Sequence, residues 1–317
     1  MQKMISRCGF ISVMSLSLST IANAGILTDS SGGTFTISGD DDLSSPNLDG
    51  AELSNETLSF INLENASLTN ANFSNGGLLA ARFGGANLSN ANLNSASLRF
   101  ASFNLANLTN ADLSNTNLLS ASLVGANLST ASFQGALLSR AELQNANLNA
   151  TSFNGASISS SNFSNTDLSN SDFSNATISD INFSNSILTT ATFTLATFMD
   201  ADFRNLDLSG ADFSGANIDT GTFRGANLTG VDFSSSQLGM IDFSGVDLSG
   251  ADLSNTDLDS DFVNIFFEDT IYDSSTVFDS QFDPTTVAGL VLVIPEPSST
   301  ALLGLGGLAL MSRRRRL

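Results

Sequence analysis

Apolar residues recur at every fifth position along most of the chain. From Leu43 to Leu258, 44 successive positions five residues apart hold 26 Leu, 15 Phe and 3 Ile. The residue two places before each of them is usually small, and it is Ala at 25 of the 44. An α-helix repeats every 3.6 residues and a strand every 2, so neither element alone produces this spacing. The pattern predicts a coil of short straight faces, with one large residue of each face pointing inward.

The second residue after each central apolar residue predicts a tight turn. It is Asn at 14 and Gly at 11 of the 44 positions. These residues tolerate a positive φ, which a type II turn requires at its third residue. We therefore expect each pentapeptide to be a short extended face followed by a turn. The backbone groups of each face would pair with the coils on either side.

The spacing of Phe predicts the number of faces in one coil. Fourteen of the fifteen central Phe residues have numbers ending in 3, and Phe198 is the exception. Phe therefore recurs every ten residues, which requires an even number of faces if like side chains are to stack. Four faces place Phe on two opposite walls and Leu or Ile on the other two. The 44 units then make eleven coils of twenty residues, and at ~4.8 Å per coil the rod is ~50 Å long.

The repeated unit, A-(D/N)-L-x-x in its commonest form, resembles that of the pentapeptide-repeat family over roughly two-thirds of the chain. The resemblance implies an all-β fold, a right-handed square (quadrilateral) β-helix solenoid. Two units depart from the pattern, because Pro46 and Glu56 occupy inward positions where Ala is usual. We expect the first coil or two to be irregular, with Glu56 turned outward.

Short caps are predicted at both ends of the repeat, which spans residues 43–260. Residues 25–42 contain TFTI at 34–37, which we expect to form a strand over the first coil. Residues 261–294 leave the five-residue register and are expected to form a C-terminal cap and linker. An open coil end would expose apolar core and unpaired backbone groups. The aromatic residues expected to plug the last coil are Phe262, Phe266, Phe267 and Phe278.

Residues 1–24 have the layout of a secretory signal peptide. Lys3 and Arg7 precede an apolar run, and the segment ends with small residues at Ala22 and Ala24. Cleavage is expected before Gly25. The single Cys of the chain lies inside this segment, so disulfides play no part in the expected mature protein.

The segment 295–317 resembles the PEP-CTERM sorting signal of bacteria with a double membrane. Pro295, Glu296 and Pro297 precede an apolar run from about residue 298 to 311, and Arg313, Arg314, Arg315 and Arg316 follow it. The run is shorter than the ~17–25 residues of an ordinary spanning helix, and the arginines favour a cytoplasmic end. The resemblance implies a transient anchor in the inner membrane. A sorting protease of the exosortase type would cut near the triplet and release the protein to the cell surface or extracellular matrix.

Acidic residues dominate the expected mature chain. Residues 25–294 contain 30 acidic residues and five arginines, a net charge of −25, so direct binding of nucleic acid is excluded. The repeat places some of the acids in outward columns: Asp172, Asp212, Asp232 and Asp252 in one, and Asp167, Asp207 and Asp247 in the next. Some pentapeptide-repeat proteins use such columns to imitate DNA and occupy topoisomerases, which is one alternative function. An export signal at each end argues against a cytoplasmic target.

The residues give little support to catalysis or to a specific metal site. Without His, and with Cys only in the expected signal peptide, nucleophile–base pairs built on these residues are excluded. Two carboxylates suffice for glycoside hydrolysis, so a carbohydrate-active β-helix enzyme is a second alternative. However, 44 units without an insertion leave no loop to build a cleft, and we predict no enzyme activity and no cofactor. Positions 1, 3, 5 and 12 of a calcium loop are matched, but Phe262 stands where Gly is required. These weak candidate ligands are Asp257, Asp259, Asp261 and Glu268.

An apolar strip with two arginines is expected along one edge of the early coils. On a coil of twenty residues its members fall in neighbouring outward columns: Phe60, Leu79, Arg99, Phe100, Leu119, Leu137 and Arg140. A partner protein, a second copy or the N-terminal segment would dock on it; scattered exposed apolar residues are the alternative. We predict an exported, non-catalytic scaffold of the cell surface or matrix, which presents an acidic polar rod to polysaccharide, cations or proteins.

Overall fold

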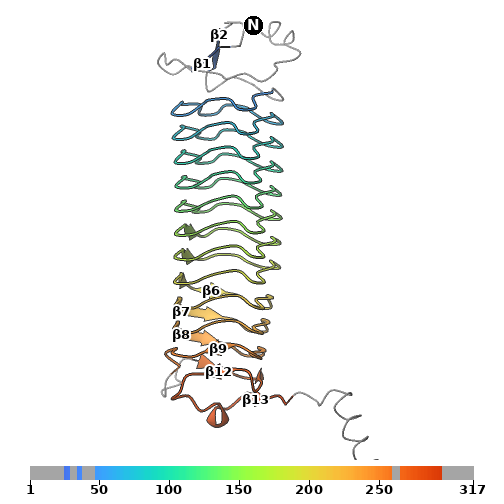
Figure 1. The fold of residues 1–317 in the computed structure, drawn as a ribbon, viewed down its shortest axis with the longest axis vertical. Helices are drawn as coiled ribbons and strands as arrows, with labels where there is room; N and C mark the ends of the chain where they lie inside the picture. Colours follow the sequence, from blue (N-terminus) through green and yellow to red (C-terminus); the bar gives the residue numbers. More distant parts are fainter. Residues whose placement is uncertain (1–24, 29–33, 38–46, 259–264, 295–317) are drawn as a thin grey trace, which may run out of the picture.

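The computed structural model describes residues 25–28, 34–37, 47–258 and 265–294. It shows a rod of stacked coils that runs the length of the repeat (Figure 1). Parallel β-bridges join residues twenty positions apart, from the pair Asn47 and Ser67 to the pair Asp232 and Asp252. Each pentapeptide contributes one such pairing position, so a coil takes four pentapeptides, as predicted. The right-handed sense of the coil, its square section and the count of eleven coils stay predictions.

The longest strands follow one another up a single side of the rod. They form a parallel sheet in the order β3 (Ser157–Ser159), β4 (Thr177–Ser179), β5 (Thr197–Met199), β7 (Asn217–Thr222), β8 (Gln237–Asp242) and β10 (Ile265–Phe266), and β6 (Ala201–Asp202) also pairs with β7. Elsewhere in the shaft, apart from the two-residue strand β9 (Asp252–Leu253), the straight faces are too short to exceed single bridges. The all-β architecture follows from the five-residue unit, which leaves no run long enough for a helix.

The turns lie where the sequence predicts them. The backbone N–H of Ala51 donates to the carbonyl of Leu48 at 3.0 Å, and Gly50, the third residue of this turn, has φ +68°. From Gly50 to Asn255 every fifth residue has a positive φ, except at Thr220 and Met240. At these two corners β7 and β8 continue without a turn.

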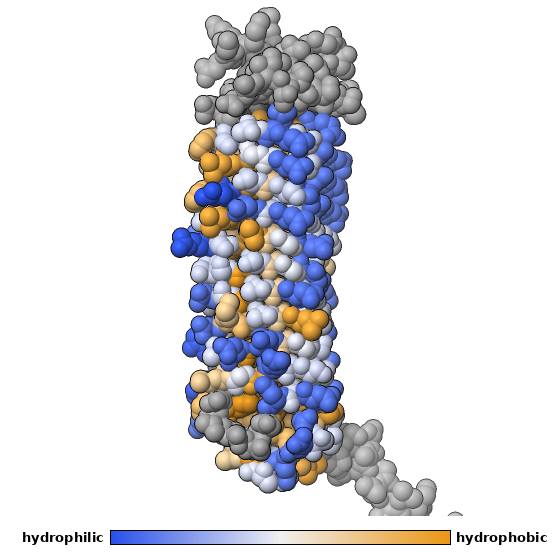
Figure 2. Space-filling model, turned by 90° about the vertical axis from the view of Figure 1, so that its left-hand side faces the viewer, coloured by the Kyte–Doolittle hydropathy of each residue, from blue (hydrophilic) through white to orange (hydrophobic). Residues whose placement is uncertain are grey.

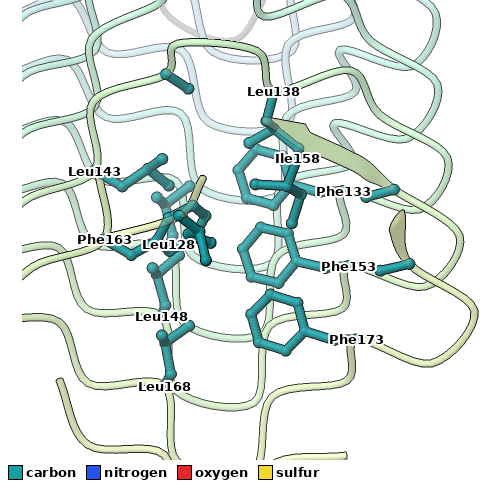
Figure 3. Packing of buried hydrophobic residues seen from close by; sticks show 14 of the residues in the cluster. Leu128, Phe133, Leu138, Leu143, Leu148, Phe153, Ile158, Phe163, Leu168 and Phe173 are labelled. Carbon is teal, nitrogen blue, oxygen red and sulfur yellow. The ribbon is translucent and has the colours of Figure 1, made fainter. Parts of the chain in front are cut away.

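The core consists of stacked walls of like side chains (Figure 3). Phe133, Phe153 and Phe173 form part of one Phe wall, with ring centroids 5.0 and 4.7 Å apart. The opposite wall contains Phe163 and Phe183, and rings of the two walls meet edge to face, as Phe153 and Phe163 do at 5.7 Å. The prediction of Phe on two opposite walls is confirmed. Each fully buried side chain stabilises the fold by roughly 1.5–3 kcal/mol, which the entropy of ordering the unit offsets in part.

Polar residues at the inward Ala positions are accommodated by hydrogen bonds to turn carbonyls. Thr166 donates to the carbonyl of Phe163 at 2.6 Å, and Ser171 to that of Leu168 at 2.7 Å. The prediction that Glu56 turns outward is wrong, because Glu56 is buried at 8% exposure in a regular coil. The residue above it in the next coil is Gly76, which has no side chain to fill the space. Pro46 lies outside the described residues.

The N-terminal flank forms a hairpin. β1 (Gly25–Thr28) pairs antiparallel with β2 (Thr34–Ile37), so the strand predicted for TFTI is present. It lies beyond the first coil at the end of the rod (Figure 1).

The C-terminal flank continues the parallel pairing of the shaft, but its paired residues are more than twenty positions apart in the sequence. β10 pairs with residues 24 positions earlier in β8, and β12 (Val277–Phe278) pairs with residues 25 positions earlier in β9 (Asp252–Leu253). β11 (Thr270–Tyr272) pairs with β13 (Leu290–Leu292), and a 3-10 turn spans Pro284–Thr286. Pairing therefore extends past the predicted end of the repeat.

Aromatic rings cover the core at the C-terminal end. Phe267 stacks on Phe243 with ring centroids 5.7 Å apart, and Phe278 stacks on Phe282 at 4.9 Å. Phe267 is buried and Phe278 packs against the core, as predicted. The same prediction is wrong for Phe266, which is 54% exposed because its neighbour takes the inward position. The fourth predicted residue, Phe262, lies outside the described residues.

Candidate functional site

The processing residues lie at or beyond the edges of the described chain. Gly25 begins β1. Ala22 and Ala24, the Pro295–Pro297 triplet and the arginines 313–316 lie outside the described residues, so both cleavage sites stay predictions. Among the residues that the structure does describe, no helix has the length and hydropathy needed to cross a membrane.

The weak calcium candidate is not assembled within the described part of the chain. Asp259 and Asp261 lie outside it, and Glu268 is exposed. Asp257 accepts a hydrogen bond from the backbone N–H of Leu238 at 2.6 Å, so one of its carboxylate oxygens is already used in joining neighbouring coils. Within the described ranges no three acidic residues gather in a way that would hold a metal ion.

The acidic columns have a structural role that sequence reasoning missed. In Asp172, Asp212, Asp232 and Asp252 one carboxylate oxygen accepts the backbone N–H of the residue two positions on, at 2.7–2.9 Å. Asp167, Asp207 and Asp247 in the next column do the same at 2.9–3.1 Å. Asn side chains at equivalent positions make the same bond, as Asn87 does to the N–H of Ser89. These side chains therefore hold the turns, and in Asp212 the second carboxylate oxygen also accepts the hydroxyl of Thr194 at 3.0 Å.

Among the described residues, three carboxyl groups have a pKa below the usual range. The Arg204 guanidinium donates two hydrogen bonds to Asp202, at 2.9 and 2.6 Å, and lowers the pKa of that carboxyl. Hydroxyl and backbone donors two residues on lower the pKa of Asp273 and of Asp283. All three shifts favour the ionised form, whereas a general acid for glycoside hydrolysis needs a raised pKa.

Two shallow depressions open on the described surface. One, of about 440 Å³, is lined by residues 181–185, 202 and 204–206, and it contains one carboxylate, Asp202, already paired with Arg204. The other, of about 540 Å³, lies where the cap meets the last coils, and its wall includes Arg224, Asp242 and Glu268. One oxygen of Asp242 accepts the N–H of Ser244 at 2.9 Å. Neither depression resembles the deep, loop-built cleft of a polysaccharide-cleaving enzyme.

The structure brings the predicted apolar strip together on one edge of the early coils (Figure 2). Phe60 is 58% exposed, Phe100 52% and Leu137 48%, while Leu79 and Leu119 are half-buried. Stacking is shown by backbone hydrogen bonds from Phe60 to Leu79 at 2.8 Å and from Phe100 to Leu119 at 3.0 Å. The guanidinium of Arg99 lies 5.8 Å from the ring centre of Phe100, and Arg140 is exposed further along the edge.

Models of the pentapeptide repeat match most of the shaft. The model described as "Pentapeptide repeat region" matches residues 126–197 and 156–233, and "Pentapeptide repeats (8 copies)" matches residues 42–76, 80–110 and 222–260. The chain belongs to the pentapeptide-repeat family. Proteins of this family are generally non-enzymatic structural or binding proteins, and no catalytic family is indicated. No curated protein matches the chain at a significant level.

Solved pentapeptide-repeat structures are similar to this chain. HetL, a protein involved in heterocyst differentiation regulation from the cyanobacterium Nostoc sp. strain PCC 7120, is 24% identical, with a TM-score of 0.36 over 73% of this chain and 91% of HetL. QnrB1, a plasmid-mediated fluoroquinolone resistance protein, is 17% identical, with a TM-score of 0.23 over 83% of this chain and 97% of QnrB1. A pentapeptide-repeat protein from the Arabidopsis thaliana thylakoid lumen is 28% identical, with a TM-score of 0.17 over 36% of this chain and 70% of its own.

The C-terminal end carries a second recognised feature. Residues 293–316 match the PEP-CTERM protein-sorting motif. This motif implies export, sorting to the cell surface in Gram-negative bacteria, and processing by exosortase in general.

Proposed function

We propose that this protein is an exported, non-catalytic scaffold of the cell surface or extracellular matrix, which binds polysaccharide along its polar columns. The proposal combines the sorting motif at residues 293–316 with the regularity of the shaft. The signal peptide at residues 1–24, cleavage near Pro295 and a transient inner-membrane anchor belong to the same proposal.

The observation that carries the binding function is the ladder of amide and hydroxyl groups outside the core. Asn107 donates its side-chain amide to Asn87 at 3.1 Å, and Asn147 donates to Asn127 at 3.2 Å. Two positions further in each coil the chain presents Thr69, Ser89, Thr109 and Ser129 in a parallel column. Groups that repeat every ~4.8 Å along a straight rod offer a regular set of hydrogen bonds to a long chain rich in hydroxyl groups.

The first test is localisation combined with intact mass. Cytoplasmic, membrane and extracellular fractions of the native host are separated, and the protein is weighed in each. We expect an extracellular or surface-bound species that begins at Gly25 and ends near Pro295. A full-length species confined to the cytoplasm would refute export, and it would make topoisomerase the next target to test.

The second test is co-sedimentation of the purified chain with the insoluble matrix polysaccharide of its host. A variant with Thr69, Ser89, Thr109 and Ser129 changed to Ala removes four hydroxyl groups from one column and preserves the core. We expect it to lose at least half of the bound fraction. A matched variant with four Ser-to-Ala changes in another column, at Ser174, Ser214, Ser234 and Ser254, controls for general loss of polarity. Equal binding by both variants and the unaltered chain would refute the assignment of the binding column.

A further inference from the structure

One edge of the rod can be followed from end to end as two adjacent columns. The first column contains residues 79, 99, 119, 139, 159, 179, 199, 219 and 239, and the second contains the residue that follows each of them. Backbone hydrogen bonds join successive coils, from Ala80 to Arg99 at 2.8 Å, from Arg140 to Ser159 at 2.8 Å and from Ser160 to Ser179 at 3.0 Å. Further along, Ser179 pairs with Met199, and Thr220 with Met240. We call these two columns the edge.

The two halves of the edge carry opposite charges beside apolar side chains. The half nearer the N-terminus holds Arg99 and Arg140 with Leu79, Phe100 and Leu119. The half nearer the C-terminus holds Asp180, Asp200 and Asp219 with Met199 and Met240. Both methionines are about half exposed, at 47% and 52%. The middle of the edge is small and polar, with Ser139, Ser159, Ser160 and Ser179.

Among the residues that the structure describes, the charged groups of the edge form no salt bridge. The salt bridges in the described part of the chain are Arg82 with Glu64 and Arg204 with Asp202, on the neighbouring face. Arg99, Arg140 and Asp219 are exposed and belong to neither pair. An edge with both signs of charge and exposed apolar groups therefore offers a surface that is complementary to itself.

We propose that two copies of this protein pack edge to edge and antiparallel, with the two-fold axis at Ser159 and Ser160. An axis that lies along the strand direction reverses the order of the coils and keeps each column opposite the same column of the second copy. Each coil on one side of the axis then faces the coil at the same distance on the other side. The resulting partners are Arg140 with Asp180, Leu119 with Met199, Arg99 with Asp219, and the Leu79–Ala80 pair with Met240.

Charge selects this arrangement over the alternatives. In a parallel pair the same coils would lie opposite each other, so Arg99 would approach Arg99 and Asp219 would approach Asp219. In the antiparallel pair each Arg–Asp contact occurs twice, because a two-fold interface is isologous. The net charge of each copy opposes association, but physiological salt screens charges that are separated by more than ~8–10 Å. The contact residues therefore decide the outcome.

The size of the contact sets the expected strength. Eight coil steps from Leu79 to Met240, at ~4.8 Å each, give a length of ~38 Å, and four residues of strand give a width of ~13 Å. About 500 Å² per copy, or ~1,000 Å² in total, lies at the lower end of specific interfaces. We expect a reversible dimer with a dissociation constant in roughly the micromolar range.

Charge exchange tests the register directly. Sedimentation equilibrium compares the unaltered chain with Arg99→Asp, with Asp219→Arg and with the double variant that carries both changes. Each single change places like charges opposite each other twice per dimer, and we expect dissociation constants to rise roughly tenfold or more. The double variant restores both pairs with the signs exchanged, and we expect association within about threefold of the unaltered chain.

A matched control separates the edge from general charge. Arg224→Asp changes the net charge by the same amount as Arg99→Asp at an exposed position on the neighbouring face, and we expect no change in association. Circular dichroism on every variant checks that the fold is retained. The proposal is overturned if the unaltered chain stays monomeric up to ~100 μM, if the double variant does not regain association, or if Arg224→Asp weakens it as much as Arg99→Asp. The first result would leave a different protein, or the N-terminal segment, as the occupant of the apolar strip.

Discussion

Stacking of aromatic rings predicts that two equally buried Phe residues contribute different amounts to the free energy of unfolding. Phe193 contacts four other rings, with centroids 4.6–6.1 Å away: Phe173, Phe198, Phe203 and Phe213. Phe103 stacks on one ring, Phe83, at 4.8 Å. Both side chains are fully buried. The perturbation is Phe→Leu at each site, because Leu already occupies rungs of the same walls.

The expected magnitude follows from the number of ring contacts. Loss of apolar volume is the same at both sites, so it cancels in the comparison. An aromatic pair contributes ~0.5–1.5 kcal/mol beyond burial, and Phe193 has three more pairs than Phe103. We expect Phe193→Leu to lower the free energy of unfolding by ~1.5–4.5 kcal/mol more than Phe103→Leu.

Urea unfolding followed by circular dichroism gives the global comparison. Long repeat arrays can lose cooperativity, so amide hydrogen exchange in the coils around each site provides a local one. A common destabilisation of the two variants, within ~0.5 kcal/mol, would refute the view that ring stacking adds to burial in this core.

Three other predictions concern turns, pH and close backbone contacts. Asp232→Ala should lower the free energy of unfolding by about 1 kcal/mol, because the N–H of Ser234 loses its acceptor, whereas Asp232→Asn keeps the bond and should cost little; thermal melts compare the two. The lowered pKa of Asp202 means that its contribution is present above the ordinary pKa and disappears as the pH falls through the folded-state pKa; melts at pH 7 and pH 3 should show the unaltered chain losing its advantage over Asp202→Asn. Gly239→Ala should destabilise the last coils by more than ~2 kcal/mol, because the new Cβ would clash with the carbonyl oxygen of Asp219.

Controls for these changes are present in the chain. Arg204→Gln removes the charged donor that lowers the pKa of Asp202, and it should abolish most of the pH-dependent difference, which is small for so exposed a pair. Gly155 has φ +65° and open space around it, so Gly155→Ala should cost only about 1 kcal/mol of backbone strain. If the two Gly variants were equally stable, the close approach at Gly239 would have no energetic weight. If Asp232→Ala and Asp232→Asn melted at the same temperature, the hydrogen bond from the N–H of Ser234 to residue 232 would not stabilise the turn.

The shaft is predictable because one residue in five is a large apolar side chain that faces inward. That single requirement is visible as 44 unbroken positions, and the spacing of Phe adds the length of the coil. The turns follow from Asn and Gly, but Thr220 and Met240 show the limit of this reasoning. At these corners the pairing of Thr220 with Met240 extends β7 and β8, and tertiary pairing overrides the local turn.

Two features of the candidate sites escape the periodic pattern. Phe266 and Phe267 cannot be told apart by spacing, because the offset of 24 residues between β8 and β10 arises from an insertion whose path the repeat does not define. The bonds from Asp172 and its equivalents to backbone N–H groups depend on the geometry of the turn. The tendency of Asp and Asn to bond their own backbone two residues on was nevertheless available as a signal.

The core and the surface of this rod repeat with different periods along the sequence. The core repeats every five residues, or every ten where Phe alternates, while the pairing of residues twenty apart defines each outward column. Loss or gain of one pentapeptide would keep a large apolar residue at each inward central position, yet it would rotate every later unit by one face. If one pentapeptide were lost or gained between Ser160 and Asp180, for example, all the acidic residues of the edge would move to a neighbouring edge of the rod. Duplications of twenty residues keep every column in phase, so a lineage can lengthen or shorten this protein freely in that unit without disturbing its surface.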